Sequence, residues 1–235
     1  GLILSRDKAL TKKVLSYDGI PIPAFAIAPV KHAFRRPNHL RFPLIVKSLT
    51  QDASFGISQA SVVNDDRKLR DRIAYIHEGL GTGAIVEQYI NGRELYVGVI
   101  GNERLHAFPP WEMKFINMPK GAHKIATARV KWSASYQRKH GIRCGKARLH
   151  KPGMAESLQL LAKRVFHLLQ MNGYGRIDVR LDDDGQPWVL EANANPQLAY
   201  GEDFAESAHY DGMPYETLLQ NILNVGLQWK ADRAG

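Results

Sequence analysis

Three features of the sequence predict an α+β fold of two packed lobes. Strands and helices follow one another in a mixed order along the chain. Short turns at 101–102 and 182–185 join neighbouring strand-like segments, which is typical of antiparallel hairpins. With 235 residues, of which 44% are hydrophobic, the chain is long enough to bury a core in one large domain or two modest ones.

The first ninety residues are expected to form two helices and four extended segments. Each helix has apolar residues on one face and a polar residue at its N-cap. They are Arg6–Tyr17, capped by Ser5, and Asp65–Glu78, capped by Asn64. The extended segments are Ala24–Ala28, Leu44–Lys47, Ile57–Val63 and Ala84–Gln88. The glycines of 79–83 precede a strand, so they do not form the dinucleotide-binding fingerprint, whose glycines open a helix.

The rest of the chain is expected to form two hairpins and two helices. The hairpins pair Arg93–Ile100 with Arg104–Phe108, and Tyr174–Leu181 with Gln186–Leu190. The aspartates of 182–184 resemble the start of a calcium loop, but no glutamate follows at its twelfth position, which favours a plain turn. The helices cover 154–169, with a continuous apolar stripe, and 215–227.

The net charge of +9 indicates anionic partners. Ten lysines or arginines and no acidic residue occur between Lys120 and Lys151, which fits either a solvated basic loop or a surface for phosphates or nucleic acid. Trp132 and Tyr136 are the aromatic residues of this stretch, which is little for base stacking. No apolar run approaches the ~20 residues of a membrane span. The single cysteine, Cys144, indicates a reducing compartment, and the expected location is the cytoplasm.

The second predicted hairpin carries a cluster of polar residues on one face. Because side chains alternate along a strand, Arg176, Asp178 and Arg180 share a face, and Glu191 should lie opposite Asp178. Asn193, two residues further, extends the same face. Two carboxylates and an amide oxygen suit magnesium. An exposed hairpin with ordinary ion pairs explains the same residues equally well.

Three upstream segments are compatible with nucleotide binding, although each alone is a weak signal. Lys47 ends an apolar strand beside the loop 51–56, where a lysine and main-chain N–H groups can hold phosphates. The strand 85–90 runs into a polar link that can present its main chain to an adenine. Glu94 follows seven residues after Glu87 and could accept hydrogen bonds from ribose hydroxyls.

Taken in this order, the segments resemble the ATP-grasp superfamily and, within it, the D-alanine–D-alanine ligase-like branch. The matching stretches are 7–13 with 19–23, 42–47, 86–90 with 92–94, and 175–178 with 190–196. The resemblance implies an ATP-grasp fold, in which two α+β lobes clasp ATP between antiparallel sheets. It also implies a central lid subdomain at 1–92 and a C-terminal catalytic subdomain at 93–235. The family's amino-terminal domain has no counterpart here, so we expect the chain to be part of a longer protein.

The resemblance also implies a role for each candidate residue. Those implied to bind ATP are Lys8 and Lys47 at the phosphates, Ser54 and Gly56 in the covering loop, Glu87, Gln88, Tyr89 and Ile90 around the adenine, and Glu94 at the ribose. Asp178, Glu191 and Asn193 would bind two magnesium ions, with manganese as an alternative. Lys131 would reach the terminal phosphates, and Arg176 would stabilise the reaction intermediates.

The implied reaction is ATP-dependent, ADP-forming ligation of a small carboxylate to an amine through an acyl-phosphate. Three positions depart from the family pattern: Ala53 before Ser54, Trp132 in place of a tyrosine, and Asn195–Leu198 in place of a glycine-containing turn. All three concern the amino-acid pocket, so the chemistry is expected to be retained while the substrate stays open.

The implied partners are ATP and an amino acid or peptide, with no membrane, and a homodimer is in keeping with the family. Two alternatives remain, a degenerate ATP-grasp module that binds or senses nucleotide without turnover, and a less favoured nucleic-acid-binding module that uses the basic stretch.

Overall fold

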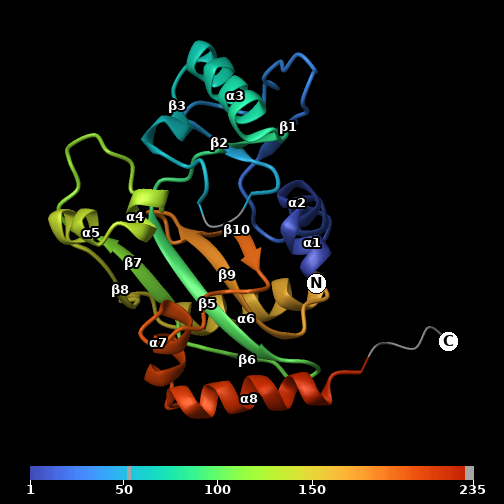
Figure 1. Cartoon of the computed structure of the whole chain (residues 1–235), viewed down its shortest axis with the longest axis vertical. Coiled ribbons are helices and arrows are strands. Elements are labelled where there is room, and N and C mark those ends of the chain that lie inside the picture. The colour runs from blue at the N-terminus through green and yellow to red at the C-terminus, as the bar shows by residue number, and fades with distance from the viewer. Residues whose placement is uncertain (52–53, 231–235) are drawn as a thin grey trace.

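The computed structural model describes residues 1–51 and 54–230 and contains two antiparallel sheets, one in each of two lobes (Figure 1). The small lobe lies at the top of Figure 1 and the large lobe fills the lower part of the view. Within the described residues, no helix combines the length and the apolar character needed to cross a membrane. The α+β prediction with two lobes is therefore confirmed.

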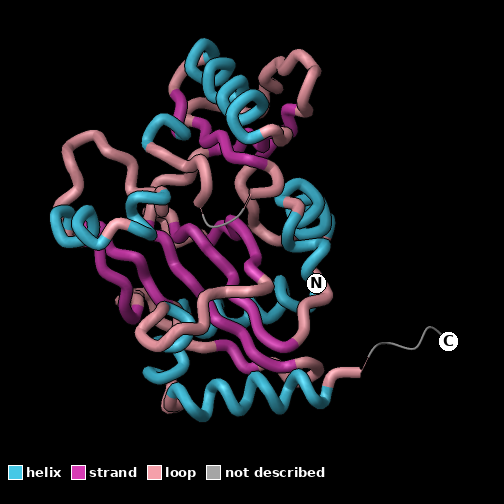
Figure 2. The backbone as a smooth tube through the Cα atoms, viewed as in Figure 1, coloured by secondary structure: helices cyan, strands magenta, loops and turns pink. Residues whose placement is uncertain are grey.

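The small lobe is a four-stranded sheet covered on one face by a helix. The strand order is β1-β4-β2-β3, with β1 Phe25–Ala28, β4 Ala84–Gln88, β2 Leu44–Ser48 and β3 Val62–Val63. Helix α3, Asp66–Leu80, lies over this sheet (Figure 2). Its apolar side chains pack against the strands, and the short 3-10 helix η1, Gln59–Ser61, precedes β3. Because side chains alternate, Leu44 and Val46 enter the core under α3. Ile45 and Lys47 therefore face the other lobe.

The large lobe is built on a six-stranded sheet. Its order is β10-β9-β5-β7-β8, with β6 beside β5; the bounds are β5 Arg93–Gly101, β6 His106–Ala107, β7 Trp111–Phe115, β8 Ile142–Lys146, β9 Gly173–Leu181 and β10 Pro187–Asn193. Helix α6, Met154–Leu168, covers one face, where Ile177 and Val179 of β9 are fully buried. The predicted alternation along this strand is correct, since Asp178 and Arg180 point to the opposite face.

The remaining helices surround the large sheet. Helices α1, Leu2–Arg6, and α2, Lys8–Tyr17, lie beside β10, and Leu15 of α2 joins the core beneath α6. Helices α7, Asp203–Tyr210, and α8, Tyr215–Gln228, pack together around Phe204 and Leu218. Helices α4, Ala128–Trp132, and α5, Ala134–His140, precede the edge strand β8. The predicted boundary between the subdomains at residue 92 remains a prediction.

Several local predictions were wrong at helix starts. The first helix does not run unbroken from Arg6, because the chain breaks at Asp7, whose carboxylate accepts hydrogen bonds from the main-chain N–H groups of Ala9 and Leu10 and so begins a new helix. Ser5 lies inside α1 and is not the N-cap. Asp65, and not Asn64, caps α3 by accepting from the N–H of Lys68 at 2.8 Å.

Strand predictions were too long in two places, and the basic stretch is not a loop. The segment 57–63 forms a 3-10 turn and a two-residue strand, and the segment 104–108 contributes two residues as β6.

The basic stretch contains helices α4 and α5 and strand β8. Thr127 and Ser133 cap the two helices through their hydroxyl groups. Strand β7 and helix α7 were not predicted.

Candidate functional site

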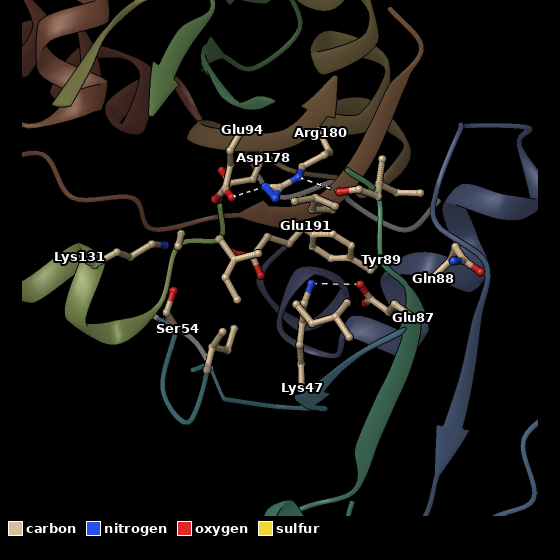
Figure 3. Close-up of a pocket in the computed structure, with 16 residues that line it drawn as sticks. Lys47, Ser54, Glu87, Gln88, Tyr89, Glu94, Lys131, Asp178, Arg180 and Glu191 are labelled. Atoms are coloured by element: carbon tan, nitrogen blue, oxygen red, sulfur yellow. Dashed lines mark hydrogen bonds and ion pairs between the residues drawn. The ribbon is translucent and has the colours of Figure 1, made fainter. Parts of the chain in front are cut away.

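A pocket lies between the two lobes and is lined by residues of both sheets (Figure 3). The empty space in this cleft, with its open mouth included, amounts to ≈ 620 Å³. Every predicted site residue except Lys8, Gly56, Arg176 and Asn193 lines it. The fold therefore brings together residues that are up to about 140 positions apart in the sequence, from Lys47 to Glu191.

The link after β4 forms one end of the pocket. The main-chain N–H groups of Gln88 and Tyr89 donate to the carbonyls of Ala24 and Pro43 at 2.8 and 3.1 Å, so neither is available to a ligand. The carbonyl of Ile90 accepts from Arg180 Nε at 3.1 Å. The N–H of Ile90 has no hydrogen-bond partner in the described part of the chain. A single open N–H beside apolar walls suits an acceptor nitrogen of a purine.

Glu94 and Arg180 form a buried pair beside this link. The sheet register places them opposite each other, and Arg180 Nη1 donates to Glu94 Oε2 at 2.9 Å. Glu94 Oε1 accepts from the Tyr96 hydroxyl at 3.0 Å. Each carboxylate oxygen keeps a second lone pair, so Glu94 can still accept a hydroxyl of a ligand.

Glu87 does not project freely toward a base. Its side chain is 1% exposed and lies between two ammonium groups, with Lys47 Nζ at 3.0 Å and Lys12 Nζ at 3.4 Å. Burial alone would raise the pKa of Glu87, but Lys12 and Lys47 lower it below its ordinary value. The carboxylate is therefore ionised, and its negative charge holds Lys47 at the pocket wall.

The predicted phosphate-binding residues occupy different places. Ser54 lines the pocket with a left-handed backbone (φ 61°), whereas Gly56 lies outside it and its carbonyl accepts from Arg72 Nη2. Lys8 is buried at the start of α2, and its ammonium group donates to the carbonyl of Gln51 at 2.7 Å. Ala53, one of the departures from the family pattern, lies outside the described residues.

The acidic end of the pocket is formed by β9 and β10. The register pairs Glu191 with Asp178, as predicted. Arg176 binds Asp178 through two hydrogen bonds, Nε to Oδ1 at 2.7 Å and Nη2 to Oδ2 at 2.9 Å, and its guanidinium stacks over Tyr96. Within the described residues, the carboxylate of Glu191 takes part in no hydrogen bond or ion pair.

The two carboxylates are in different electrostatic states. Burial, reinforced by Glu191, raises the pKa of Asp178 to about 6 against the opposing effect of Arg176. Burial alone would raise the pKa of Glu191 too, but Lys8, Lys131 and Lys47 lower it to about 2. Glu191 is thus a charged carboxylate whose oxygens have no direct protein partner in the described chain.

This donor set fits a magnesium ion of the kind that bridges protein and phosphate. Magnesium commonly takes one or two carboxylates and completes its shell with water and phosphate oxygens. Asp178 and Glu191 supply such a pair, and among the described residues no larger cluster of His, Cys, Asp and Glu is arranged to hold a metal by itself. The third predicted ligand, Asn193, lines the second pocket described below and not this one, and its Oδ1 accepts a hydrogen bond from the N–H of Asn195 at 2.9 Å.

A second pocket adjoins the first. It shares Lys131 and Glu191 with the first pocket, and it contains Arg176 and Asn193. Its other lining residues come from helices α1 and α4, from β10 and from the segment after it, and they include Arg6, Trp132 and Gln197. A molecule in the second pocket would therefore meet a molecule in the first at Lys131 and Glu191.

Residue patterns alone missed part of the site. Arg180 was placed on the correct face, two residues after Asp178, but given no role. Lys12 lies one helical turn after Lys8, a spacing that places two side chains on one face of a helix and is therefore a signal for a second lysine beside the first. Ile125, which is 4% exposed and packs with Ile45, had no detectable signal because it lies in an irregular segment.

Comparison with known proteins gives one consistent result. The family model described as D-ala D-ala ligase C-terminus matches residues 14–224. The uncharacterized protein y4sG of Sinorhizobium fredii is 30% identical over 224 residues, 94% of this chain and 62% of that protein. The D-alanine–D-alanine ligase of Bordetella petrii is 30% identical over 228 residues, 94% of this chain and 64% of the ligase.

Solved structures show the same fold. The D-alanine–D-alanine ligase from Bacillus anthracis complexed with ATP has a TM-score of 0.76 at 21% identity, over 96% of this chain and 67% of that one. The VanG D-Ala:D-Ser ligase from Enterococcus faecalis has a TM-score of 0.72 at 20% identity, over 94% and 62%. The chain thus spans roughly two thirds of the length of these proteins. Since the family model covers most of the sequence, the chain belongs to the D-alanine–D-alanine ligase family of ATP-grasp proteins and corresponds to that family's C-terminal region.

Proposed function

We propose that this chain binds ATP with magnesium between its lobes and uses it to join a carboxylate to an amine. One observation carries the proposal: the pocket that holds the link after β4 and the carboxylate pair shares the lining residues Lys131 and Glu191 with a second pocket. A nucleotide in the first pocket with its phosphates near Lys131 would place its terminal phosphate where a second substrate can reach it. Phosphoryl transfer depends mainly on such positioning and on charge neutralisation.

In the proposed complex the base lies at the N–H of Ile90, between apolar residues such as Ile45 and Ile57. Glu94 accepts a ribose hydroxyl, and Lys47 and Lys8 bind phosphate oxygens. Magnesium, held by Asp178 and Glu191 with Asn193 as a further oxygen donor, would neutralise charge on the phosphates. The number of ions is part of the proposal, with two expected.

The proposed reaction takes place where the two pockets meet. A substrate carboxylate oxygen attacks the γ-phosphorus, ADP leaves, and an amine then displaces phosphate from the acyl carbon to form an amide. Lys131 and Arg176 are the cations placed to stabilise the negative charge that develops on the phosphoryl and acyl oxygens.

The substrates we propose are an amino acid and an amine of similar size, or a short peptide. The relatives are named for D-alanine or D-serine. In this chain the second pocket carries Trp132 and Gln197. Trp132 stands where the family pattern has a tyrosine, and Gln197 lies where that pattern has a glycine-containing turn. We expect these larger side chains to favour a substrate pair that differs from two D-alanines.

Thermal unfolding with and without ligand tests the binding step. Mg-ATP should raise the Tm more than ATP alone, and Asp178→Asn or Glu191→Gln should remove the difference. Asp184→Asn, an exposed aspartate in the turn between β9 and β10, is the matched control and should keep it. A wild-type chain whose Tm does not respond to Mg-ATP would contradict the proposal. Phosphate release measured over pairs of D- and L-amino acids then identifies the substrates.

A second candidate is a nucleotide-binding module without turnover. The observation that favours it is the two-point hydrogen bonding of Asp178 by Arg176, which occupies one of the two carboxylates. This candidate predicts tight ATP binding with no phosphate release for any substrate pair, and the same screen therefore distinguishes the two.

A further inference from the structure

Lys12 is a buried cation that the proposed function leaves without a task. It lies on α2, its side chain is 1% exposed, and it is not among the residues that line either pocket. Its ammonium group is 3.4 Å from Glu87 Oε1. Burying a lysine so completely is unfavourable unless a partner compensates it, so its place behind Glu87 needs a physical reason.

Lys12 and Lys47 contact Glu87 on different oxygens. Lys47 donates a hydrogen bond to Oε2 at 3.0 Å and lines the first pocket. Among the described residues, neither Lys12 Nζ nor Glu87 Oε1 has a hydrogen-bond partner. Lys47 therefore makes the shorter contact with Glu87. Lys12 lies farther from the carboxylate, and its ammonium group donates no hydrogen bond within the described residues.

The charges of this group explain why two lysines are present. Together Lys12, Lys47 and Glu87 carry a net charge of +1, one carboxylate against two ammonium groups. If Lys47 turned to a phosphate and Lys12 were absent, Glu87 would be left as a buried carboxylate without a counter-ion, which is strongly unfavourable. With Lys12 in place, the carboxylate keeps a cation whichever way Lys47 points.

We propose that Lys12 is a positioning residue for nucleotide binding, a reserve counter-ion that pairs with Glu87 when Lys47 leaves it to bind phosphate. The proposal rests on the proposed function, in which Lys47 binds the phosphates of ATP. Lys12 acts through Glu87 and Lys47 and touches no ligand itself.

The test compares the affinities of ATP and adenosine for the 235-residue chain. Lys12→Met, which removes the charge at similar volume, should weaken ATP binding roughly tenfold, because releasing Lys47 then leaves Glu87 unpaired. Adenosine, which has no phosphate and does not require Lys47 to move, should bind as in the wild type. Lys13→Met, the exposed neighbour on the same helix, is the control and should change ATP affinity by less than about twofold.

A double-variant comparison shows whether Lys12 acts through Glu87. In a Glu87→Gln background there is no carboxylate to compensate, so adding Lys12→Met should leave ATP affinity unchanged. An equal loss from Lys12→Met in both backgrounds would overturn the proposal. Equal weakening of ATP and adenosine by Lys12→Met would do the same, since it would indicate a general structural role.

A second neutral variant covers the case in which Lys12→Met does not fold. Lys12→Gln keeps a hydrogen-bond donor for Glu87 but no charge, and it should show the same selective loss of ATP affinity; wild-type affinity in this variant would overturn the proposal. Failure of the wild-type chain to bind ATP would defeat the proposed function itself. Wild-type ATP binding with unaffected Lys12 variants would defeat this inference alone.

Discussion

The two walls of the cleft carry opposite arrangements of charge. On the small-lobe side, Glu87 of β4 lies close to two lysines, Lys47 of β2 and Lys12 of the adjacent helix α2. On the large-lobe side, the two carboxylates Asp178 and Glu191 lie beside one arginine. The first group has a net charge of +1 and the second a net charge of −1. A positive wall suits the oxygens of phosphates, and a negative wall suits a metal ion, so the difference between the lobes matches the two parts of a metal–nucleotide complex.

The largest expected effect is on the small-lobe group. Glu87→Ala leaves Lys12 and Lys47 without their partner and should lower the free energy of unfolding by about 4 kcal/mol at pH 7, as when one member of a buried pair is removed. Burial then lowers the pKa of Lys12 further in the folded state, so the unfolded state binds more protons and stability rises with pH. In urea denaturation, the free energy of unfolding of Glu87→Ala should therefore lie closer to that of the wild type at pH 9 than at pH 7.

The exposed Glu78→Ala on α3 is the control for that measurement and should have little effect at either pH. If the loss of unfolding free energy in Glu87→Ala, relative to the wild type, stayed constant or grew with pH, the lysines would not titrate in the absence of Glu87, which would contradict this prediction.

A somewhat smaller effect is expected in the large-lobe group. Asp178→Ala leaves Arg176, whose side chain is 11% exposed, without its two hydrogen bonds and should lower the free energy of unfolding by about 3 kcal/mol. Arginine stays charged over the whole range, so the deficit should be the same at pH 7 and pH 9. If the stability of Asp178→Ala instead recovered at pH 9, as expected for Glu87→Ala, the two charged groups would not differ in their response to pH.

Lys131 tests function separately from stability. Its ammonium group makes no hydrogen bond or ion pair within the described residues, so Lys131→Met should change the free energy of unfolding by less than about 1 kcal/mol. If Lys131 stabilises the transferring phosphoryl group, phosphate release in the presence of substrates should fall by about 100-fold. The neighbouring Arg129→Met, an exposed residue outside both pockets, should retain turnover.

The smallest effect is expected at the apolar end of the cleft. Ile57→Val removes one methylene from a residue that lines the first pocket, which costs about 0.8 kcal/mol, or roughly fourfold in affinity. Because this end would contact the base, ATP and adenosine should be affected equally. A loss confined to ATP in competition binding would place Ile57 at the phosphates instead.

Sequence patterns predicted the residues of the acidic wall better than the buried cation Lys12. The alternation in Gly173–Leu181 fixes which side chains enter the core, and the turn at 182–185 aligns Val189 with Val179. A bulge between Val189 and Glu191 then shifts the register by one residue and places Glu191 opposite Asp178, so local rules alone locate this pair only to within one residue. No such local signal exists for the pairing of Lys12, because its partner Glu87 is 75 positions away and only the fold brings helix α2 and strand β4 close enough for their contact.

Irregular segments were the least predictable part. The basic stretch lacks a long apolar period, yet Val130 is buried against Tyr96 and Trp111 and so holds α4, with Lys131, at the cleft. Contacts between residues far apart in the sequence determine the structure of such a segment, so the spacing of its own residues does not predict it.

The acidic wall is proposed above all to bind a metal ion together with the nucleotide. Calorimetric titration of ATP into the wild-type chain and Glu191→Gln, with and without magnesium, tests it most directly. We expect magnesium to raise the ATP affinity of the wild type by at least about tenfold, equal to about 1.4 kcal/mol, and to have no effect on the ATP affinity of Glu191→Gln. Equal ATP affinity of the wild type with and without magnesium would contradict it.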